Sequence, residues 1–138
     1  MGRRLTDEAI RCLGVFESVT DIEGIDCVID DEFDRVAIVV PPGTLADAIG
    51  PGGEMVGRVE SRLNRDVTLI EMADYPSDFV ANALRPAAVY DVEIEDSIAR
   101  VDVAEEDRGA AIGRDGRTIE LARILADRLF DIEDIELS

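Results

Sequence analysis

The sequence contains Ala48-Ile49-Gly50-Pro51-Gly52-Gly53, and the same pattern, Ala-Ile-Gly-x-x-Gly, returns as Ala111-Ile112-Gly113-Arg114-Asp115-Gly116. Each copy follows a short apolar segment and one turn of predicted helix, and each leads into a longer amphipathic helix. Glycine at both ends of a turn permits positive φ and lets the main chain approach another molecule, because no Cβ stands in the way. A helix that starts at such a turn exposes N–H groups that attract an anion. The repeated turn therefore predicts two loops that hold phosphate groups.

The segments around the two turns also repeat, which predicts an α/β (α+β) fold in two halves. For the first half, hydrophobic periodicity predicts a helix over 6–19, strands over 25–29 and 36–40, a short helix from Thr44, a helix after the turn, and a strand over 67–72. For the second half it predicts a helix from Ser77 that Pro86 ends, strands over 89–94 and 99–103, a short helix to Ile112, a helix over 117–130, and a strand over 132–137.

Four polar residues are expected to cap helices at their N-termini. Thr6 precedes two acidic residues, which suit the positive end of a helix dipole. Thr44 has Asp47 three residues later, in the pattern of a capping box. Ser77 and Asp107 precede the first helices around the second turn and are expected to cap them.

The internal repeat predicts two small domains, residues 1–74 and 75–138, with a boundary near Asp74-Tyr75-Pro76-Ser77. A domain of this size buries only roughly 60% of the surface that its unfolded chain exposes. Each half would be marginally stable alone, so we expect the two to pack together as one rigid body.

The charge is strongly acidic, with 32 Asp and Glu residues, 14 Arg residues, no lysine, and a formal net charge of −18. This balance normally argues against nucleic acid as a partner. The apolar fraction of 46%, however, is too high for a disordered acidic tail. Together these features resemble the composition of halophilic proteins. At molar salt the Debye length is about 3 Å, so carboxylates that do not touch a phosphate scarcely repel it.

The sequence offers no convincing catalytic, metal or cofactor site. It has no histidine, and without lysine neither glycine turn is a Walker A motif. Cys12 and Cys27 are expected to be buried thiols, and the acidic stretch 30–34 is expected to be a surface turn and not a calcium loop. There is no apolar signal segment and no run of about 18 apolar residues. We expect a cytoplasmic protein with no catalytic activity, no cofactor, no small-molecule substrate and no membrane partner.

An Ile-Gly-x-x-Gly turn between two helices, beside a three-stranded sheet, resembles the KH domain, whose loop clamps about four unpaired nucleotides. Further stretches resemble the archaeal NusA family of transcription termination and antitermination factors: Leu5-Thr6-Asp7-Glu8, Cys27-Val28-Ile29-Asp30-Asp31-Glu32, Ala48-Ile49-Gly50-Pro51-Gly52-Gly53-Glu54, Asn82-Ala83-Leu84-Arg85-Pro86-Ala87 and Asp107-Arg108-Gly109-Ala110-Ala111-Ile112-Gly113. The resemblance implies two tandem prokaryotic-type (type II) KH domains, each a three-stranded mixed sheet packed on three helices. It also implies binding of single-stranded RNA in termination or antitermination. It covers only the KH portion of the bacterial factor, so contact with RNA polymerase stays open.

The resemblance also implies roles for the residues of the turns. The glycines would let a phosphodiester approach the main chain: Gly50, Gly52, Gly53, Gly113 and Gly116. Ile49 and Ile112 are expected to anchor the turns to the core, although the same apolar surface can contact a base. Arg114 and Arg117 would contact phosphate or stack on bases. Because Pro51 has neither a charge nor an N–H, we expect the second turn to bind more strongly.

Two alternatives stay open at this point. A KH pair can act in RNA processing or ribosome assembly instead of termination. The chain can also be a protein-interaction module whose turns are only structural, because a Gly-x-x-Gly turn often forms a simple corner. Arg58 is ambiguous, while Arg62 and Arg123 are expected to make only solvated ion pairs on helices.

Overall fold

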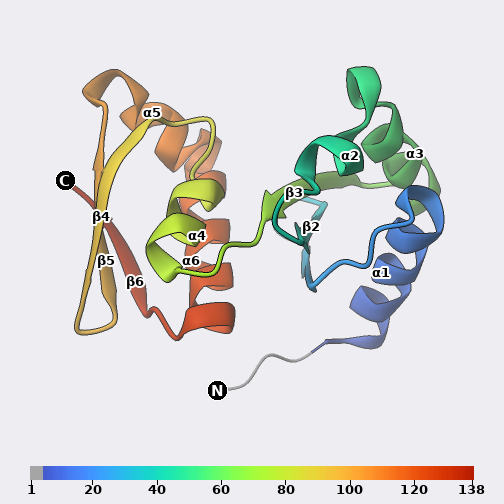
Figure 1. Ribbon diagram of the computed structural model, residues 1–138, viewed down its shortest axis with the longest axis horizontal. Coiled ribbons are helices and arrows are strands. Elements are labelled where there is room, and N and C mark those ends of the chain that lie inside the picture. The colour runs from blue at the N-terminus through green and yellow to red at the C-terminus, as the bar shows by residue number, and fades with distance from the viewer. Residues whose placement is uncertain (1–4) are drawn as a thin grey trace. The chain divides into compact units, whose positions relative to one another are not determined.

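The computed structural model describes residues 5–138 and divides the chain into two compact units (Figure 1). The N-terminal unit ends at Met72, and the C-terminal unit begins at Ala73. Within the described residues, each unit has one three-stranded sheet and three α-helices. The α+β fold class that the hydrophobic pattern predicts is confirmed, and so are the mixed sheets that the resemblance implies.

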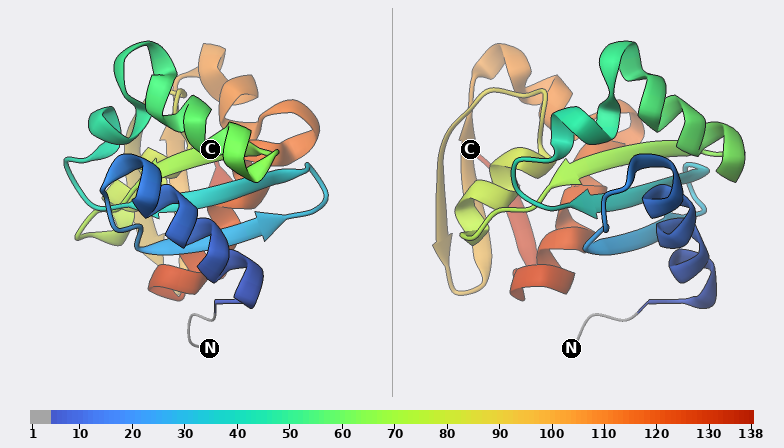
Figure 2. Two further views of the ribbon diagram at one scale, coloured as in Figure 1. Left: turned by 90° about the vertical axis from the view of Figure 1, so that its right-hand side faces the viewer. Right: turned by 45° about the vertical axis from the view of Figure 1, so that its right-hand side comes forward.

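The N-terminal unit consists of α1 (Asp7–Thr20), β1 (Asp26–Asp30), β2 (Arg35–Val40), α2 (Leu45–Ile49), a 3-10 turn (Pro51–Gly53), α3 (Glu54–Leu63) and β3 (Asp66–Glu71). Its sheet order is β1-β2-β3, in which β2 pairs antiparallel with β1 and parallel with β3. A parallel pair needs a long crossover connection, and α2, the turn and α3 provide it. Figure 2 shows α1 and α3 lying across the strands of this sheet.

The C-terminal unit repeats this order with α4 (Pro76–Ala83), β4 (Val89–Glu95), β5 (Ile98–Val103), a 3-10 turn (Glu105–Asp107), α5 (Arg108–Ile112), a second 3-10 turn (Arg114–Gly116), α6 (Arg117–Phe130) and β6 (Asp134–Leu137). The sheet order is β4-β5-β6, antiparallel and then parallel. β6 begins two residues later than the sequence predicts. Ile132 instead donates its N–H to Ala126 O at 3.3 Å and buries its side chain, which closes the end of α6.

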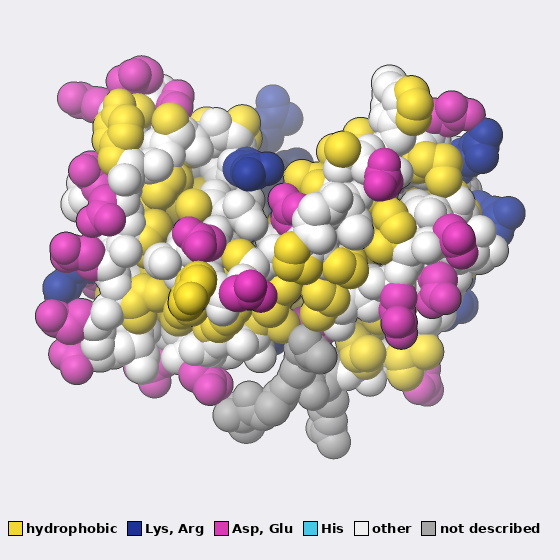
Figure 3. Space-filling model, viewed as in Figure 1, with side chains coloured by type: hydrophobic (Ala, Val, Ile, Leu, Met, Phe, Trp, Pro, Cys, Tyr) yellow, Lys and Arg dark blue, Asp and Glu magenta, His cyan; other side chains and the backbone are white. Residues whose placement is uncertain are grey.

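The acidic residues lie almost entirely on the surface, as the Asp and Glu side chains in Figure 3 show for one face. Among residues 5–138, the charged residues that are buried are Asp26 and Arg35. Arg35 is neutralised by Asp30, with Nε 2.8 Å from Oδ2, and its guanidinium lies 5.3 Å from the centre of the Phe33 ring. In that same part of the chain, no helix is both long and apolar enough to cross a bilayer.

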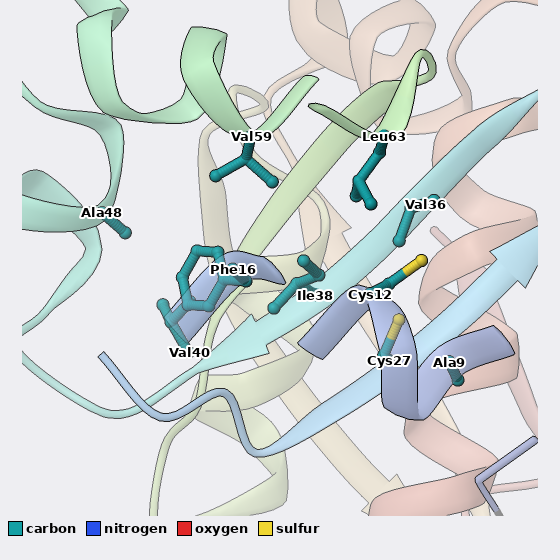
Figure 4. Close-up of a cluster of buried hydrophobic side chains, with 10 residues drawn as sticks. All are labelled: Ala9, Cys12, Phe16, Cys27, Val36, Ile38, Val40, Ala48, Val59 and Leu63. Carbon is teal, nitrogen blue, oxygen red and sulfur yellow. The ribbon is translucent and has the colours of Figure 1, made fainter. Parts of the chain in front are cut away.

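The core of the N-terminal unit forms between its helices and one face of β2 (Figure 4). Val36, Ile38 and Val40 are alternate residues of β2 and therefore point to the same face. Phe16 of α1 and Val59 of α3 belong to the same buried cluster. Truncation of a fully buried phenylalanine costs about 3–5 kcal/mol, so this cluster holds α1 to the sheet.

The C-terminal unit has an equivalent core. Phe79 of α4, Val101 of β5, Leu125 of α6 and Ile135 of β6 are fully buried. Phe79 also contacts Phe130 at the end of α6, with ring centroids 5.5 Å apart and a tilt of 46°. The first and last helices of this unit are thus joined by aromatic packing.

Of the four expected caps, only Thr6 accepts the expected bond, from Ala9 N at 3.1 Å. Thr44 instead donates its hydroxyl to Pro41 O at 2.7 Å, so the capping-box prediction is wrong. Asp107 accepts a bond from Ala88 N at 2.8 Å and so ties its turn to the segment before β4. Ser77 lies inside α4, because Pro76 takes the first helical position, where its missing N–H is harmless.

Cys12 of α1 belongs to the core of the N-terminal unit, and the pH dependence of stability tests its burial. Both cysteines are free and buried, and burial raises the pKa of the Cys12 thiol above its usual value of 9.0. The folded chain keeps the thiol proton at a pH where the unfolded chain has lost it. Stability from the neutral thiol is therefore fully present below about pH 9 and is lost as pH rises through the folded-state pKa.

We predict that the free energy of unfolding of the protein falls as pH rises above about 9, and that Cys12→Ala reduces this fall. Denaturant titrations at several pH values measure both effects. The variant will be less stable at every pH, so the slope against pH is the informative quantity. An identical slope in the variant and the parent would contradict the prediction.

Candidate nucleic-acid interface

The two Ala-Ile-Gly-x-x-Gly stretches adopt the same backbone conformation. The glycine after α2, Gly50, has φ 77° and ψ 167°, and the glycine after α5, Gly113, has φ 80° and ψ 167°. Each is followed by a 3-10 turn, Pro51–Gly53 or Arg114–Gly116, that opens into α3 or α6. The repeat in the sequence is therefore a repeat of main-chain geometry.

The first glycine of each turn is required by close packing. A Cβ on Gly50 would lie 2.8 Å from the main-chain N of Met55, and a Cβ on Gly113 would lie 2.8 Å from the main-chain N of Thr118. Both glycines also have positive φ, which side chains rarely adopt. Each turn is thus held against the first turn of the helix that follows it.

The outer positions of the turns are open instead. Gly52 and Gly53 have φ of 62° and 79°, and a Cβ added to either would meet no atom within 4 Å. In the second turn Asp115 occupies the position of Gly52 with φ 56°, a conformation that aspartate tolerates. Pro51, Gly52 and the matching Arg114 and Asp115 are exposed. The outer edge of each turn is accessible to a ligand.

The apolar residue before each turn behaves differently from the expectation. Ile49 and Ile112 are 37% and 39% exposed, so they do not anchor the turns in the core. The preceding alanines, Ala48 and Ala111, are fully buried and do so. The reason is helical spacing, because neighbours on a helix point in directions about 100° apart. An apolar side chain therefore stands beside each turn, where it can contact a base.

The helices that follow the turns start without a side-chain cap. Gly53 and Gly116 are their N-cap residues, and neither has a side-chain oxygen that could accept from the N–H groups of the first turn. The first of these N–H groups, on Glu54 or Arg117, donates to the carbonyl of Pro51 or Arg114. The remaining N–H groups and the helix dipole together favour an anion. Both turns therefore have the main-chain features of a phosphate site.

The charges around the two turns differ. Arg114 is exposed in the second turn, and Arg117 donates from Nε to Arg114 O at 3.3 Å, which keeps its guanidinium over the turn. The first turn has Pro51 in place of Arg114, and Glu54 in place of Arg117. The second turn is the more positive and has one more main-chain N–H, because proline has none.

Three further arginines depart in part from the sequence-based interpretation. Arg58 pairs with Glu54 at 2.7 Å, as a solvated helix pair would. Arg123 pairs with Glu120 at 2.6 Å but also donates to Ile135 O at 3.0 Å, so it joins α6 to β6. Arg62 makes no ion pair with any residue of the described range 5–138, contrary to the expectation.

The acidic stretch after β1 forms a turn, as predicted. Asp30 accepts a hydrogen bond from Phe33 N at 3.3 Å and pairs with Arg35, so its carboxylate is used within the turn. Over the part of the chain that the structure describes, no group of three or more His, Cys, Asp or Glu residues is arranged to hold a metal ion.

The residues that pack against the inner side of the turns were not predicted from the sequence. Met55 and Thr118 place both a main-chain N and side-chain atoms where a Cβ on the first glycine would lie, and their residue types differ between the two copies. The buried alanines could have been found, since alanine occupies the same place in both copies. Glu71 of β3 accepts a hydrogen bond from Gly43 N and so ties the segment before α2 to the sheet. The residues around Gly43 in the sequence do not indicate this contact.

Comparisons with known proteins agree with this architecture. A family model described as the NusA-like second KH domain matches residues 76–138. A protein of Halococcus morrhuae named probable transcription termination protein NusA is 52% identical over 137 residues, covering 97% of each chain. A protein of the same name from Halobacterium salinarum is 49% identical over 138 residues, covering 98% of each.

A solved structure supports the fold over the same length. The crystal structure of the protein APE1850 superimposes with a TM-score of 0.84 at 27% sequence identity. The match covers 97% of this chain and all of that one.

We predict that Gly50→Ala and Gly113→Ala each lower the free energy of unfolding by about 3 kcal/mol or more, through the contact with the next helix and the positive φ. Gly52→Ala should cost only about 1–2 kcal/mol, because its φ is positive but the space is free. Guanidinium denaturation measures the three values. Equal losses at Gly50 and Gly52 would show that the close packing is not the constraint.

Proposed function

This chain belongs to the family of archaeal NusA-like transcription termination proteins, and from that premise we propose that it binds single-stranded RNA through its two Gly-x-x-Gly turns. The single observation that supports this most is the shared geometry of the turns. Both have a packed first glycine, an exposed outer edge and an uncapped helix start behind it. An RNA backbone recognises such a surface through its phosphates.

In this proposal the chain forms two tandem KH domains of the prokaryotic type (type II), residues 1–74 and 75–138, each built around one of the two compact units. Both units support it, because each has a helix, two strands, two helices and a final strand in the same order. So does the family model of the second KH domain, which matches residues 76–138. The Gly-x-x-Gly turn of such a domain clamps the backbone of about four unpaired nucleotides.

The proposed site consists of the residues of both turns and the first residue of α6: Ile49, Gly50, Pro51, Gly52, Gly53, Ile112, Gly113, Arg114, Asp115, Gly116 and Arg117. Main-chain N–H groups at the helix starts would bind phosphate, and exposed Ile49 and Ile112 would contact a base. Arg114 and Arg117 would add charge-assisted contacts in the second turn. The second unit then binds RNA more strongly than the first.

We infer that the protein works in transcription termination or antitermination, because the two relatives described above are named as probable termination proteins. It would act in the cytoplasm as a binding protein, without catalysis, a cofactor or a small-molecule substrate. The growing transcript is its proposed ligand, and RNA polymerase is the neighbour to which that RNA is attached.

Matched changes in the two turns test the ranking. Arg114→Asp turns the second loop into Gly-Asp-Asp-Gly, and Pro51→Asp with Gly52→Asp does the same to the first. Each changes the charge by −2. Asp115, with φ 56°, shows that aspartate fits at the position that Gly52 occupies in the first turn. We predict that the dissociation constant for single-stranded RNA rises about ten- to hundredfold with Arg114→Asp and less with the Pro51 and Gly52 pair.

Arg100→Glu, on β5, is the charge-matched control and should have little effect on RNA binding. Fluorescence anisotropy with labelled RNA measures the three constants, and thermal unfolding confirms that each variant is folded. If the control weakens binding as much as Arg114→Asp does, the effect is general repulsion and not the turn.

Salt dependence gives an independent test. Each neutralised phosphate of a single strand contributes about −0.7 to the slope of log affinity against log salt, so about four contacts give a slope of about −3. We predict that this shallow slope leaves RNA binding measurable at about 1 M KCl, where long-range repulsion from the acidic surface is screened. No binding of any single-stranded RNA at low or molar salt would favour the protein-interaction alternative.

A further inference from the structure

A groove of about 650 Å³ lies between α1 and α3 of the N-terminal unit. Ser18 and Val19 line it from the end of α1, and five residues of α3 line it from the other side: Glu54, Gly57, Arg58, Ser61 and Arg62. We call it the α1–α3 groove. It contains none of the residues of the Gly-x-x-Gly turn, although it begins at the residue that follows that turn.

The α1–α3 groove is positive on a protein of net charge −18. Arg58 and Arg62 outnumber its one carboxylate, Glu54, which already pairs with Arg58 at 2.7 Å. Arg62 has no ion-pair partner in the described range, so its charge is free. Arginine side chains are visible along the edge of this unit where α1 and α3 lie (Figure 3). This excess of charge points to an anionic ligand.

Small residues are part of the lining of the α1–α3 groove. Gly57 and Ser61 are one helical turn apart, and a Cβ on Gly57 would meet no atom within 4 Å. Glycine inside a helix is destabilising relative to alanine, and packing does not explain it here. The hydroxyls of Ser18 and Ser61, which also line the groove, add hydrogen-bond donors. The groove therefore offers room, donors and positive charge together.

The α1–α3 groove is also within reach of a strand held at the first turn. With a rise of 1.5 Å per residue, Arg58 lies roughly 7.5 Å and Arg62 roughly 13.5 Å along α3 from Gly53. These are distances that neighbouring phosphates of one unpaired strand can span. Since Pro51 deprives the first turn of a positive charge, Arg58 and Arg62 supply charge that the turn itself lacks.

We propose that the α1–α3 groove binds the phosphates of the RNA segment that continues from the first turn, with Arg58 and Arg62 as the contacting residues. The proposal rests on the proposed RNA-binding function. Continuity with the turn favours RNA over an acidic segment of a protein, because only the strand already held at the turn is delivered to the groove. Guanidinium groups suit phosphate, which they bind in a bidentate fork.

The test compares Arg58→Gln with Arg62→Gln, made together, against Arg85→Gln with Arg100→Gln, which removes two exposed charges elsewhere. Arg85 lies after α4 and Arg100 on β5, and neither lines the groove. Affinity is measured for single-stranded RNAs of about four and about twelve nucleotides, with the full chain. Thermal unfolding verifies that both double variants are folded.

We expect the groove variant to weaken binding of the longer RNA about tenfold and to make its salt slope shallower by about 1.4, while the short RNA is unaffected. The control should change neither quantity. Equal behaviour of the two double variants with the longer RNA would overturn the proposal, as would equal losses for the short and the longer RNA. An acidic peptide that binds the groove when RNA does not would assign it to a protein partner instead.

The Pro51→Asp and Gly52→Asp variant distinguishes a failure of the groove proposal from a failure of the proposed RNA-binding function. If that variant weakens binding of the longer RNA but the groove variant does not, the function stands and the groove proposal falls. If the changes in both turns leave binding unaltered, the proposed function falls, and the groove proposal falls with it.

Discussion

The close approach of a glycine to the start of the next helix is the contact on which the rest of each candidate site depends. Gly50 and Gly113 lie so near the main-chain N of the residue five positions later that no side chain fits. This contact fixes the direction in which the turn leaves the short helix. It thereby places the open edge of the turn in front of an uncapped helix start. A position that excludes side chains thus creates a surface on which the main chain is exposed.

Recognition by the main chain suits a protein with so many carboxylates. The N–H groups at a helix start carry fixed partial positive charge, which needs no lysine and is unaffected by the surface composition. Exposed acidic side chains serve solubility, and at high salt they repel only a phosphate that they touch. The arginines are few, so their positions matter more than their number. Several of them are used within the fold, such as Arg35 with Asp30 and Arg123 with Asp134.

The two units have the same backbone fold but differ in where their positive charges lie. In the C-terminal unit the charge lies in the turn and at the start of α6, through Arg114 and Arg117. In the N-terminal unit it lies further along α3, at Arg58 and Arg62, beside the α1–α3 groove. In the proposed RNA-binding function, the C-terminal unit would accordingly hold phosphates chiefly at its turn, and the N-terminal unit would also hold them along a helix.

The elements and their repetition follow from the order of amino acids alone, because hydrophobic periodicity and glycine position are local properties. Reading them predicted the α+β class, the order of strands and helices, and the positions of both turns before any contact was known. The neighbours that each side chain meets depend instead on the packing of the folded chain. Thr44 and Asp107 bond to segments outside their helices, and Arg123 reaches β6, because partners from distant parts of the chain compete with local ones. Ile49 is exposed and Ala48 buried for the same reason: the direction of packing is set by the sheet, and residue type alone does not reveal it.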